Sequence, residues 1–498
     1  MKNAIVLNTL VEGSSWQGDI LGFDPVEELV KKLKSLGKED DIFVAADSAG
    51  APQLPKSLKG LKKILTEDRK AKNLFRQIYS SLKSYENVIY LFADAPLVDT
   101  GITKEMISLH TGEFAEYTYG EGFPIGAAPE IVKVDLFPKI ASLLEKDNPD
   151  AGRDSIFTGL SKEINSFDIE TYFAAVDLKL MRIELTTSSK RNAMLVERVI
   201  KKLGISCGYK QFCKFISENP AVLRTTPSYI EVEIISDHNG GCIYSPLPRL
   251  TRKAGRMSYD DFRIVLDKVR TFTESCYIAF SLWGEPLSHG DIKKFIEYTV
   301  QDKKTNLILE TDGVLFDPDF SDFVIEIGAE NLHVIFEVDA VGIETYKKIR
   351  GGDLNKVERN IRYLLSKEIP NIYVQLVRIE ENESEMLKFF DMWEKEGAKV
   401  IIQKYNSYAG LLPDLTKYDL SPLERMPCWH VLRDMVVLHD GSVSRCKQDI
   451  NCLFPLGNLL QEDISDVWER GESLYVGHCG KNYDEYCSKC DEYYTFNF

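Results

Sequence analysis

Short apolar runs alternate with amphipathic stretches along residues 1–205. The apolar runs are rich in β-branched and aromatic side chains, which is typical of buried parallel strands. Between them, residues 25–36 and 67–84 repeat their apolar positions at helical spacing. This alternation predicts an α/β domain of Rossmann-like type with a parallel sheet. The candidate strands are residues 4–7, 42–46 and 88–92.

A second series of strand and helix patterns covers residues 228–415, after a connector at 206–227. Helical runs such as 290–302 and 383–396 separate six apolar runs. Repeated strand–helix units predict a partial (β/α)6 barrel of the TIM type, with its site at the carboxyl ends of the strands. The candidate strands are residues 229–236, 277–282, 306–311, 331–338, 372–378 and 399–403.

The tail, residues 416–498, is rich in turns and contains a hairpin pattern. Residues 435–438 and 442–445 are β-prone and flank His439-Asp440-Gly441. An Asp-Gly pair between two such runs is a strong signal for a β-hairpin. The patterns therefore predict an amino-terminal α/β domain, a connector, a barrel and a small carboxyl-terminal module.

Length and charge agree with such a multidomain protein. A chain of 498 residues is too long for one ordinary core. The net charge of −16 argues against nucleic acid as a partner. No apolar run approaches the ~18 residues that span a bilayer, and residues 1–7 are expected to form a strand and not a signal peptide. We therefore expect a cytoplasmic protein without a membrane partner, of open oligomeric state.

Cysteines are concentrated in the tail. Six of the ten lie in the last 71 residues. In a reducing compartment such clustering indicates a metal centre before disulfides. The hairpin returns Cys446 towards Cys428, and Cys487-x-x-Cys490 lets two sulfurs reach one centre. The other two tail cysteines are Cys452 and Cys479.

This tail resembles the SPASM/Twitch domain that accompanies many radical SAM enzymes. The matching features are Cys428, Gly441 with Cys446 after four residues, Gly457-Asn458, the short helix at 465–468, and Cys487-x-x-Cys490. The resemblance implies that Cys428, Cys446, Cys487 and Cys490 bind one auxiliary [4Fe–4S] cluster. Cys452 and Cys479 are candidates to replace one of these ligands. A structural zinc ion on the same four thiolates is the alternative.

The barrel resembles that of radical SAM enzymes, but its cluster motif is degenerate. Those enzymes carry Cys-x3-Cys-x2-Cys after the first barrel strand, and the aligned positions here are His238, Cys242 and Ser245. A serine hydroxyl is a poor ligand at neutral pH because it must lose a proton of high pKa. We therefore expect the catalytic cluster to be lost, since thiolates are its usual ligands.

Other features after the barrel strands are retained. Gly284-Glu285-Pro286 follows the second strand and resembles the motif that contacts the amino group of S-adenosylmethionine, which implies a site for that cofactor; on its own the tripeptide is a common turn. Glu310 and Asp339 stand at the ends of the third and fourth strands, where barrel enzymes bind ligands. Helix caps or turns would also explain them.

In the first domain, Asp94 follows the third candidate strand. It resembles the strand-end aspartate of sugar-nucleotide cytidylyltransferases, which holds a divalent metal; the alternative is a helix cap. The loop at 10–19 contains glycines but no Lys or Arg. Nucleotidyltransferases need a basic loop there to hold a triphosphate, so this departure argues against transferase activity.

The order of a nucleotidyltransferase-like domain, a radical-SAM-like barrel and a SPASM tail resembles the spiro-SPASM family. The leading hypothesis is an iron–sulfur protein of radical SAM descent that acts as a binding or accessory protein, for example for a peptide. One alternative is an active radical SAM enzyme that modifies a peptide or protein. Another is a sugar-nucleotide nucleotidyltransferase acting through residues 1–205. At this point it is open whether the protein is an enzyme.

Overall fold

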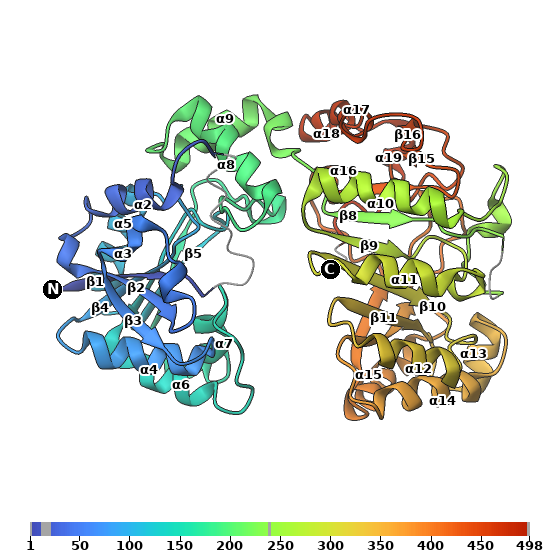
Figure 1. Ribbon diagram of the computed structural model, residues 1–498, viewed down its shortest axis with the longest axis horizontal. Helices are drawn as coiled ribbons and strands as arrows, with labels where there is room; N and C mark the ends of the chain where they lie inside the picture. The colour runs from blue at the N-terminus through green and yellow to red at the C-terminus, as the bar shows by residue number, and fades with distance from the viewer. Residues whose placement is uncertain (1, 11–20, 238–240, 496–498) are drawn as a thin grey trace. The chain divides into compact units, whose positions relative to one another are not determined.

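The computed structural model describes residues 2–10, 21–237 and 241–495. It divides the chain into two compact units, Met1–Thr225 and Thr226–Phe498 (Figure 1). Within the described ranges no helix combines the length and the hydropathy needed to cross a bilayer.

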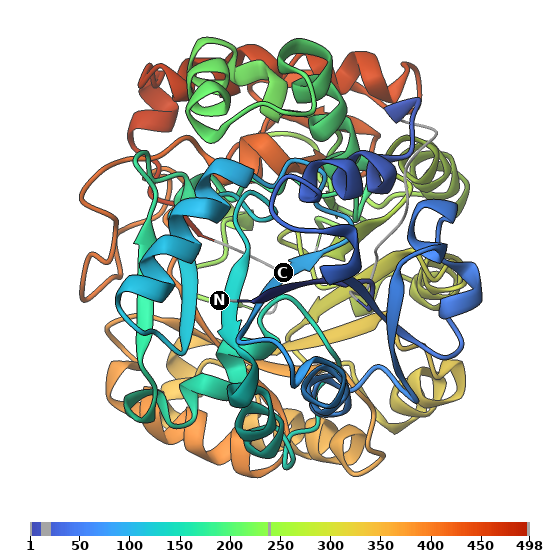
Figure 2. The ribbon, with the colours of Figure 1, turned by 90° about the vertical axis from the view of Figure 1, so that its left-hand side faces the viewer.

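The first unit is built on a seven-stranded sheet in the order β3-β2-β1-β4-β6-β5-β7. The strand nearest the amino terminus, β1, lies inside this sheet and pairs in parallel with β2 and β4 (Figure 2). The three strands predicted from the sequence are β1, β2 and β4. The strands are β1 (Asn3–Asn8), β2 (Ile42–Asp47), β3 (Lys62–Thr66), β4 (Asn87–Phe92), β5 (Tyr117–Glu121), β6 (Glu130–Lys133) and β7 (Ile169–Phe173).

Helices cover both faces of this sheet. Alternate side chains of β1, β2 and β4 pack either against α4 and α6 or against α2 and α3, in two separate apolar clusters. This two-sided burial explains why the central strands are continuous apolar runs. The helices are α2 (Pro25–Leu33), α3 (Lys56–Lys59), α4 (Ala71–Leu82), α5 (Thr100–Gly112), α6 (Phe137–Leu143), α7 (Ser155–Ser161), α8 (Lys190–Leu203) and α9 (Tyr209–Glu218).

The second unit contains all six predicted barrel strands as neighbours in one parallel series, from β8 to β13. They are β8 (Tyr229–Val232), β9 (Cys276–Phe280), β10 (Thr305–Thr311), β11 (Leu332–Glu337), β12 (Ile372–Arg378) and β13 (Lys399–Lys404). The helices between them are α10 (Tyr259–Thr273), α11 (Ile292–Val300), α12 (Pro318–Ile327), α13 (Ile343–Ile349), α14 (Leu354–Leu365) and α15 (Met386–Lys395). The fold is therefore mixed α/β, as expected.

The tail continues the barrel sheet. Strand β14 pairs in parallel with β8 and forms an antiparallel hairpin with β15, which confirms the predicted hairpin. Strand β8 ends earlier than predicted, at Val232, because the Ile234 amide turns back to the Val232 carbonyl at 3.1 Å. The elements of the tail are β14 (Asp434–Val437), β15 (Ser442–Ser444), β16 (Pro455–Asn458), α16 (Trp429–Arg433), α17 (Ile464–Glu469), α18 (Glu472–Cys479) and α19 (Glu485–Ser488).

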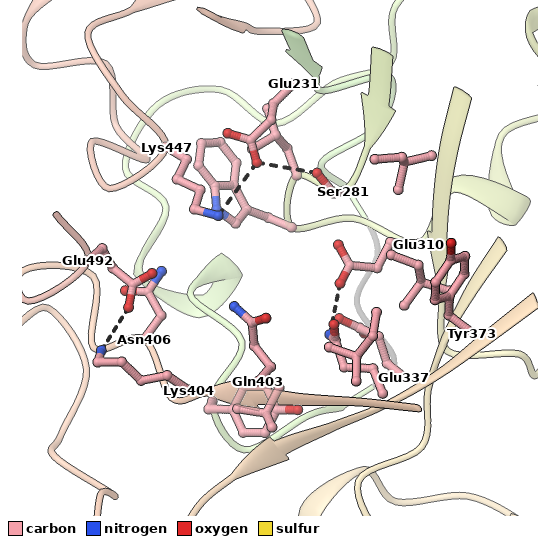
Figure 3. Close-up of a pocket in the computed structure, with 18 of the residues that line it drawn as sticks. Glu231, Ser281, Glu310, Glu337, Tyr373, Gln403, Lys404, Asn406, Lys447 and Glu492 are labelled. Atoms are coloured by element: carbon pink, nitrogen blue, oxygen red, sulfur yellow. Dashed lines mark hydrogen bonds and ion pairs between the residues drawn. The ribbon is translucent and has the colours of Figure 1, made fainter. Parts of the chain in front are cut away.

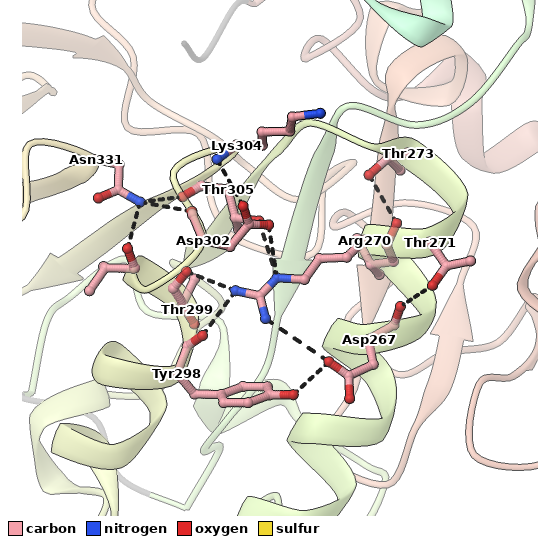
Figure 4. Close-up of polar contacts among 12 residues, drawn as sticks. Asp267, Arg270, Thr271, Thr273, Tyr298, Thr299, Asp302, Lys304, Thr305 and Asn331 are labelled. Carbon is pink, nitrogen blue, oxygen red and sulfur yellow. Dashed lines mark hydrogen bonds and ion pairs between the residues drawn. The ribbon is translucent and has the colours of Figure 1, made fainter. Parts of the chain in front are cut away.

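A partly buried arginine ties α10 to the turn between α11 and β10 (Figure 4). The Arg270 guanidinium donates to the carbonyls of Tyr298 and Thr299, at 2.9 Å each, and lies 3.3 Å from the Asp302 carboxylate. The two carbonyls belong to the last turn of α11, where backbone acceptors lack partners within the helix. Arg270 therefore closes the end of that helix and joins two outer helices.

Candidate functional site

The four predicted cluster ligands come from different parts of the tail. Cys428 immediately precedes α16, Cys446 follows β15, and Cys487 lies in α19 with Cys490 just after it. Their thiols are close enough to influence one another: Cys428 interacts electrostatically with Cys446 and Cys487, and Cys490 with Cys428 and Cys446. The fold thus brings together sulfurs that are 62 residues apart in the sequence.

Backbone amides surround these sulfurs. The Cys428 sulfur accepts from the amides of His430 and Val431, and the Cys446 sulfur from those of Gln448 and Asp449. The Glu492 amide donates to the Cys490 sulfur at 3.4 Å. Such donors stabilise negative charge on sulfur and tune a bound cluster.

Burial has the opposite effect on the thiols. It raises the pKa of Cys428 and of Cys487 to about 12, and it also raises the pKa of Cys446 and Cys490. Buried thiols of this kind stay protonated unless a cation replaces the proton. The neighbouring Arg445 guanidinium favours the charged form of Cys446 and Cys487. The donor set fits a site where iron replaces four protons.

The other two tail cysteines have different surroundings. Cys452 packs against Leu282 and Val436, and burial raises its pKa to about 11. Cys479 ends α18 and interacts with the Tyr475 hydroxyl. Neither thiol is among the main groups that shift the pKa of the four candidate ligands. Over the described ranges, no three His, Cys, Asp or Glu side chains form a group suited to a single metal ion.

In the barrel, the remnants of the catalytic loop and the Gly-Glu-Pro turn line one small cavity. Cys242 and Ser245 line it together with Gly284 and Glu285, around a volume of about 110 Å³. Burial raises the pKa of Cys242 to about 11. His238 lies outside the described residues. The described part of this loop supplies one thiol and one hydroxyl, a donor set that does not fit a cluster held by three thiolates.

The Gly-Glu-Pro turn is held tightly. A Cβ on Gly284 would come within 2.3 Å of the Ile235 carbonyl oxygen, so only glycine allows this approach. The Glu285 carboxylate accepts from the amides of Leu287 and Asp312 and from the Thr311 hydroxyl. Burial and the Asp312 carboxylate raise the pKa of Glu285. Its hydrogen bonds therefore join the ends of the second and third barrel strands.

Sequence reasoning missed an arginine beside this cavity. The Arg350 guanidinium donates to Glu337 at 2.6 Å, to the Tyr244 hydroxyl at 2.9 Å and to Asp339. Asp339 was noted as a strand-end carboxylate, whereas Arg350 lies at the end of α13 with no motif around it. The signal that could have suggested Arg350 is the presence of a basic residue close in sequence to the acidic strand ends Glu337 and Asp339.

In the first unit, Asp94 is 2% exposed and forms an ion pair with Arg153. Its Oδ1 atom has no hydrogen-bond partner. The alternative reading as a helix cap is wrong, because Asp99 caps α5 by accepting from the amides of Gly101 and Ile102. Arg153 thus provides the positive charge that a divalent metal would bring. Most of the loop at 10–19 lies outside the described residues.

Comparison with known proteins matches two segments of the second unit. Residues 238–392 match the family model of the Radical SAM superfamily, and residues 428–491 match that of an iron–sulfur cluster-binding domain, SPASM. The chain is therefore a radical SAM/SPASM-like protein. It belongs to the same family as an uncharacterized protein of Treponema pallidum (strain Nichols), which is 30% identical over 358 residues, 69% of this chain and 98% of that protein.

More distant similarities cover parts of the chain. The S-adenosyl-L-methionine-dependent 2-deoxy-scyllo-inosamine dehydrogenase of Niallia circulans is 22% identical over 272 residues, 53% of this chain and 92% of that protein. A solved cytidylyltransferase structure from Leptospira borgpetersenii aligns with 45% of this chain and 96% of that chain, at 18% identity and a TM-score of 0.37. The latter value is too low to carry an argument about function.

Proposed function

We propose that the protein is an iron–sulfur-binding accessory or binding protein, whose auxiliary cluster is held by Cys428, Cys446, Cys487 and Cys490. The observation that carries this proposal is the mutual proximity of four thiols, two buried and two partly buried, three of which accept hydrogen bonds from backbone amides. When bound, the cluster supplies a redox-active centre and cross-links three separate segments of the tail. The chain's own residues position the sulfurs and keep water away.

The test is the metal and acid-labile sulfide content of the full chain purified without oxygen. We expect about four iron and about four sulfide per chain, as one [4Fe–4S] cluster requires. One zinc without sulfide would replace the cluster by a structural ion. About eight iron per chain would instead indicate a second cluster. That result would contradict the expectation that the catalytic cluster is lost.

An active radical SAM enzyme is the second candidate. It is favoured by the cavity that Cys242 shares with Gly284 and Glu285, because the Gly-Glu-Pro turn resembles the motif that contacts S-adenosylmethionine. Against it stands the single thiolate of the described loop. Reduction of the reconstituted protein with S-adenosylmethionine is expected to give no 5′-deoxyadenosine, and its stoichiometric formation would establish the enzyme.

Transferase activity of the first unit is the third candidate. Its supporting observation is a cavity of about 710 Å³ beside β4 and β5, lined in part by Arg153 and Lys179. The Asp94–Arg153 ion pair counts against a metal there, since Asp94 already has a cation partner. We expect no pyrophosphate release from any of the common nucleoside triphosphates with magnesium.

A further inference from the structure

A second cavity, of about 350 Å³, lies inside the barrel (Figure 3). Alternate residues of five of the parallel strands, β8 and β10 to β13, line it, because successive side chains of a strand face opposite sides. Its floor is apolar and includes Tyr229, Ile308 and Ile335. Two residues further along three of these strands stand Glu231, Glu310 and Glu337. A layer of carboxylates therefore lies above an apolar floor.

Most charges around the cavity are paired. Lys404 binds Glu492 at 2.8 Å and Asp491 at 2.6 Å. Arg350 neutralises Glu337 at 2.6 Å. Lys447 reaches Glu231 at 3.7 Å.

Glu310 differs from these residues. Its carboxylate accepts a hydrogen bond from the Gln375 amide at 2.9 Å, and within the described part of the chain no basic side chain is ion-paired with it. It remains partly exposed to the cavity. Among the described residues, this carboxylate thus faces the cavity without a directly paired cation, and Lys447 acts on it only beyond ion-pair distance.

Glu231 provides an independent sign of a missing partner. Its side chain is 2% exposed, and Oε1 accepts from the Ser281 hydroxyl at 3.3 Å. The other oxygen, Oε2, has no hydrogen-bond partner. A buried acceptor without a donor is energetically costly, so such atoms call for an explanation. A donor carried by a ligand would satisfy it.

Aromatic rings complete the walls. Tyr373 and Tyr408 line the cavity together with Tyr229. Burial raises the pKa of Tyr408, and the nearby carboxylates of Glu310, Glu337 and Glu231 act in the same direction. Carboxylates combined with aromatic faces are the usual environment of bound ammonium groups.

We propose that this cavity binds an organic cation, a primary ammonium group on an apolar body, with Glu310 as its counter-charge and Glu231 Oε2 as a second acceptor. This names the ligand class of the binding role proposed above and rests on that role, but it does not require an occupied cluster. A cavity of this size accepts a small amine or one extended amine-bearing side chain.

Calorimetric titration of the full chain tests the charge requirement. The probes are cyclohexylamine, its neutral counterpart cyclohexanol and its anionic counterpart cyclohexanecarboxylate. We expect saturable binding of one amine per chain and at least about tenfold weaker binding of the other two, since each tenfold corresponds to about 1.4 kcal/mol. Equal binding of amine and alcohol would overturn the proposal, as would failure of the amine to bind.

Substitutions of Glu310 test whether the amine binds in this cavity. Glu310→Gln is expected to weaken the amine at least about tenfold and to leave the alcohol unchanged. Glu326→Gln, an exposed glutamate of α12, is the matched control and should behave as the wild type. An unchanged amine affinity in a folded Glu310→Gln protein would refute the assignment. If that variant does not fold, Glu310→Asp, which keeps the charge but shortens its reach, should weaken the amine without abolishing binding, and unchanged affinity there would also refute it.

Two further measurements complete the test. The first distinguishes the possible sources of the ammonium group, and the second distinguishes this proposal from the cluster proposal. Tighter binding of N-acetyl-lysine amide than of cyclohexylamine would indicate a lysine side chain of a peptide, and the reverse a small amine. Iron and sulfide are measured on the same samples. Amine binding without a cluster would refute the cluster assignment alone, whereas a cluster without amine binding would refute this inference alone.

Discussion

Individual residues determine how the two carboxylate-rich sites of the barrel behave. Glu285 is fully satisfied by three donors, whereas Glu310 meets one amide and two neighbouring carboxylates. The first holds two strand ends together, and the second faces the cavity without an ion pair to any described residue. Glu285 thus holds the fold together, whereas Glu310 is the residue that we propose binds a ligand.

Stability should depend on pH through Glu310. Burial, then Glu337 of β11, raise the pKa of Glu310, and Glu231 of β8 acts in the same direction, while Gln375 of β12 and Lys447 oppose them. Since its folded-state pKa lies above the unfolded value, the native state is favoured at low pH and loses this contribution as pH rises through neutrality. Urea unfolding from about pH 5 to about pH 9 should show Glu310→Gln gaining stability over the wild type with rising pH. The Glu326→Gln control should show no such trend, and a constant difference for Glu310→Gln would contradict the assignment.

Single cysteines should divide into ligands and bystanders. Cys446→Ala is expected to abolish the visible absorption and the bound iron, because three thiolates cannot complete a four-cysteine site. Cys452→Ala is the matched control, since that thiol packs against Leu282 and Val436, and it should retain both. Retention of the full iron content in Cys446→Ala would show that another residue completes the ligand set.

A glycine controls the turn at the second barrel strand. Gly284→Ala should lower the free energy of unfolding by about 2 kcal/mol, because its Cβ would meet the Ile235 carbonyl oxygen at 2.3 Å. Gly290→Ala is the control, since nothing lies within 4 Å of a Cβ there. Urea unfolding of both variants compares them directly, and equal effects would mean that the turn moves freely.

At the scale of elements, strands and helices are joined by a small number of buried or partly buried contacts. The parallel pairing of β8 with β14 places Met435 and Val437 in the same apolar cluster as the barrel helices. The end of α11 relies on one guanidinium for two of its carbonyls. Element boundaries therefore matter more for stability here than any surface ion pair.

Removing the guanidinium that closes α11 should be costly. Arg270→Met is expected to lower the free energy of unfolding by about 2 kcal/mol, because two carbonyls lose their donor and the Asp302 carboxylate loses its ion-pair partner. The control Arg359→Met replaces an exposed arginine of α14 and should change stability by less than about 0.5 kcal/mol. Chemical unfolding measures the free energy of unfolding of both variants. If Arg270→Met loses no more stability than Arg359→Met, the contacts of Arg270 contribute no more than those of a surface residue.

At the scale of the whole molecule, the tail and the barrel share one sheet. The four-part division expected from the sequence remains a proposal about domains, and it predicts a SPASM module at 416–498. The continuous sheet instead favours the entire second unit as the smallest piece that holds the cluster.

Truncation separates these views. A fragment of residues 226–498 is expected to unfold cooperatively and to bind iron, because it keeps the β8–β14 pairing. A fragment of residues 416–498 should not bind iron, since β14 would lose both its parallel neighbour and its apolar cover. Iron and sulfide analysis with far-ultraviolet circular dichroism checks both fragments. A cluster in the shorter fragment would make the tail an autonomous module.

The sequence alone determined the central strands, the hairpin and the grouping of the tail cysteines. Apolar periodicity, Asp440-Gly441 and the spacing of Cys487 and Cys490 are local signals, and local signals can be read along a chain. The apolar pattern did not predict strand β3. It is an edge strand, and its exposed lysines interrupt the apolar pattern.

Only the tertiary structure decided the rest. It joined β14 to β8, paired Asp94 with Arg153 and set Arg350 against two strand-end carboxylates. It also left Glu310 facing a cavity with no ion pair to a basic side chain of the described residues. Such pairings depend on which distant side chains meet in a medium of low polarity, where an uncompensated charge is costly. That information is absent from spacing, because it arises when the strands assemble.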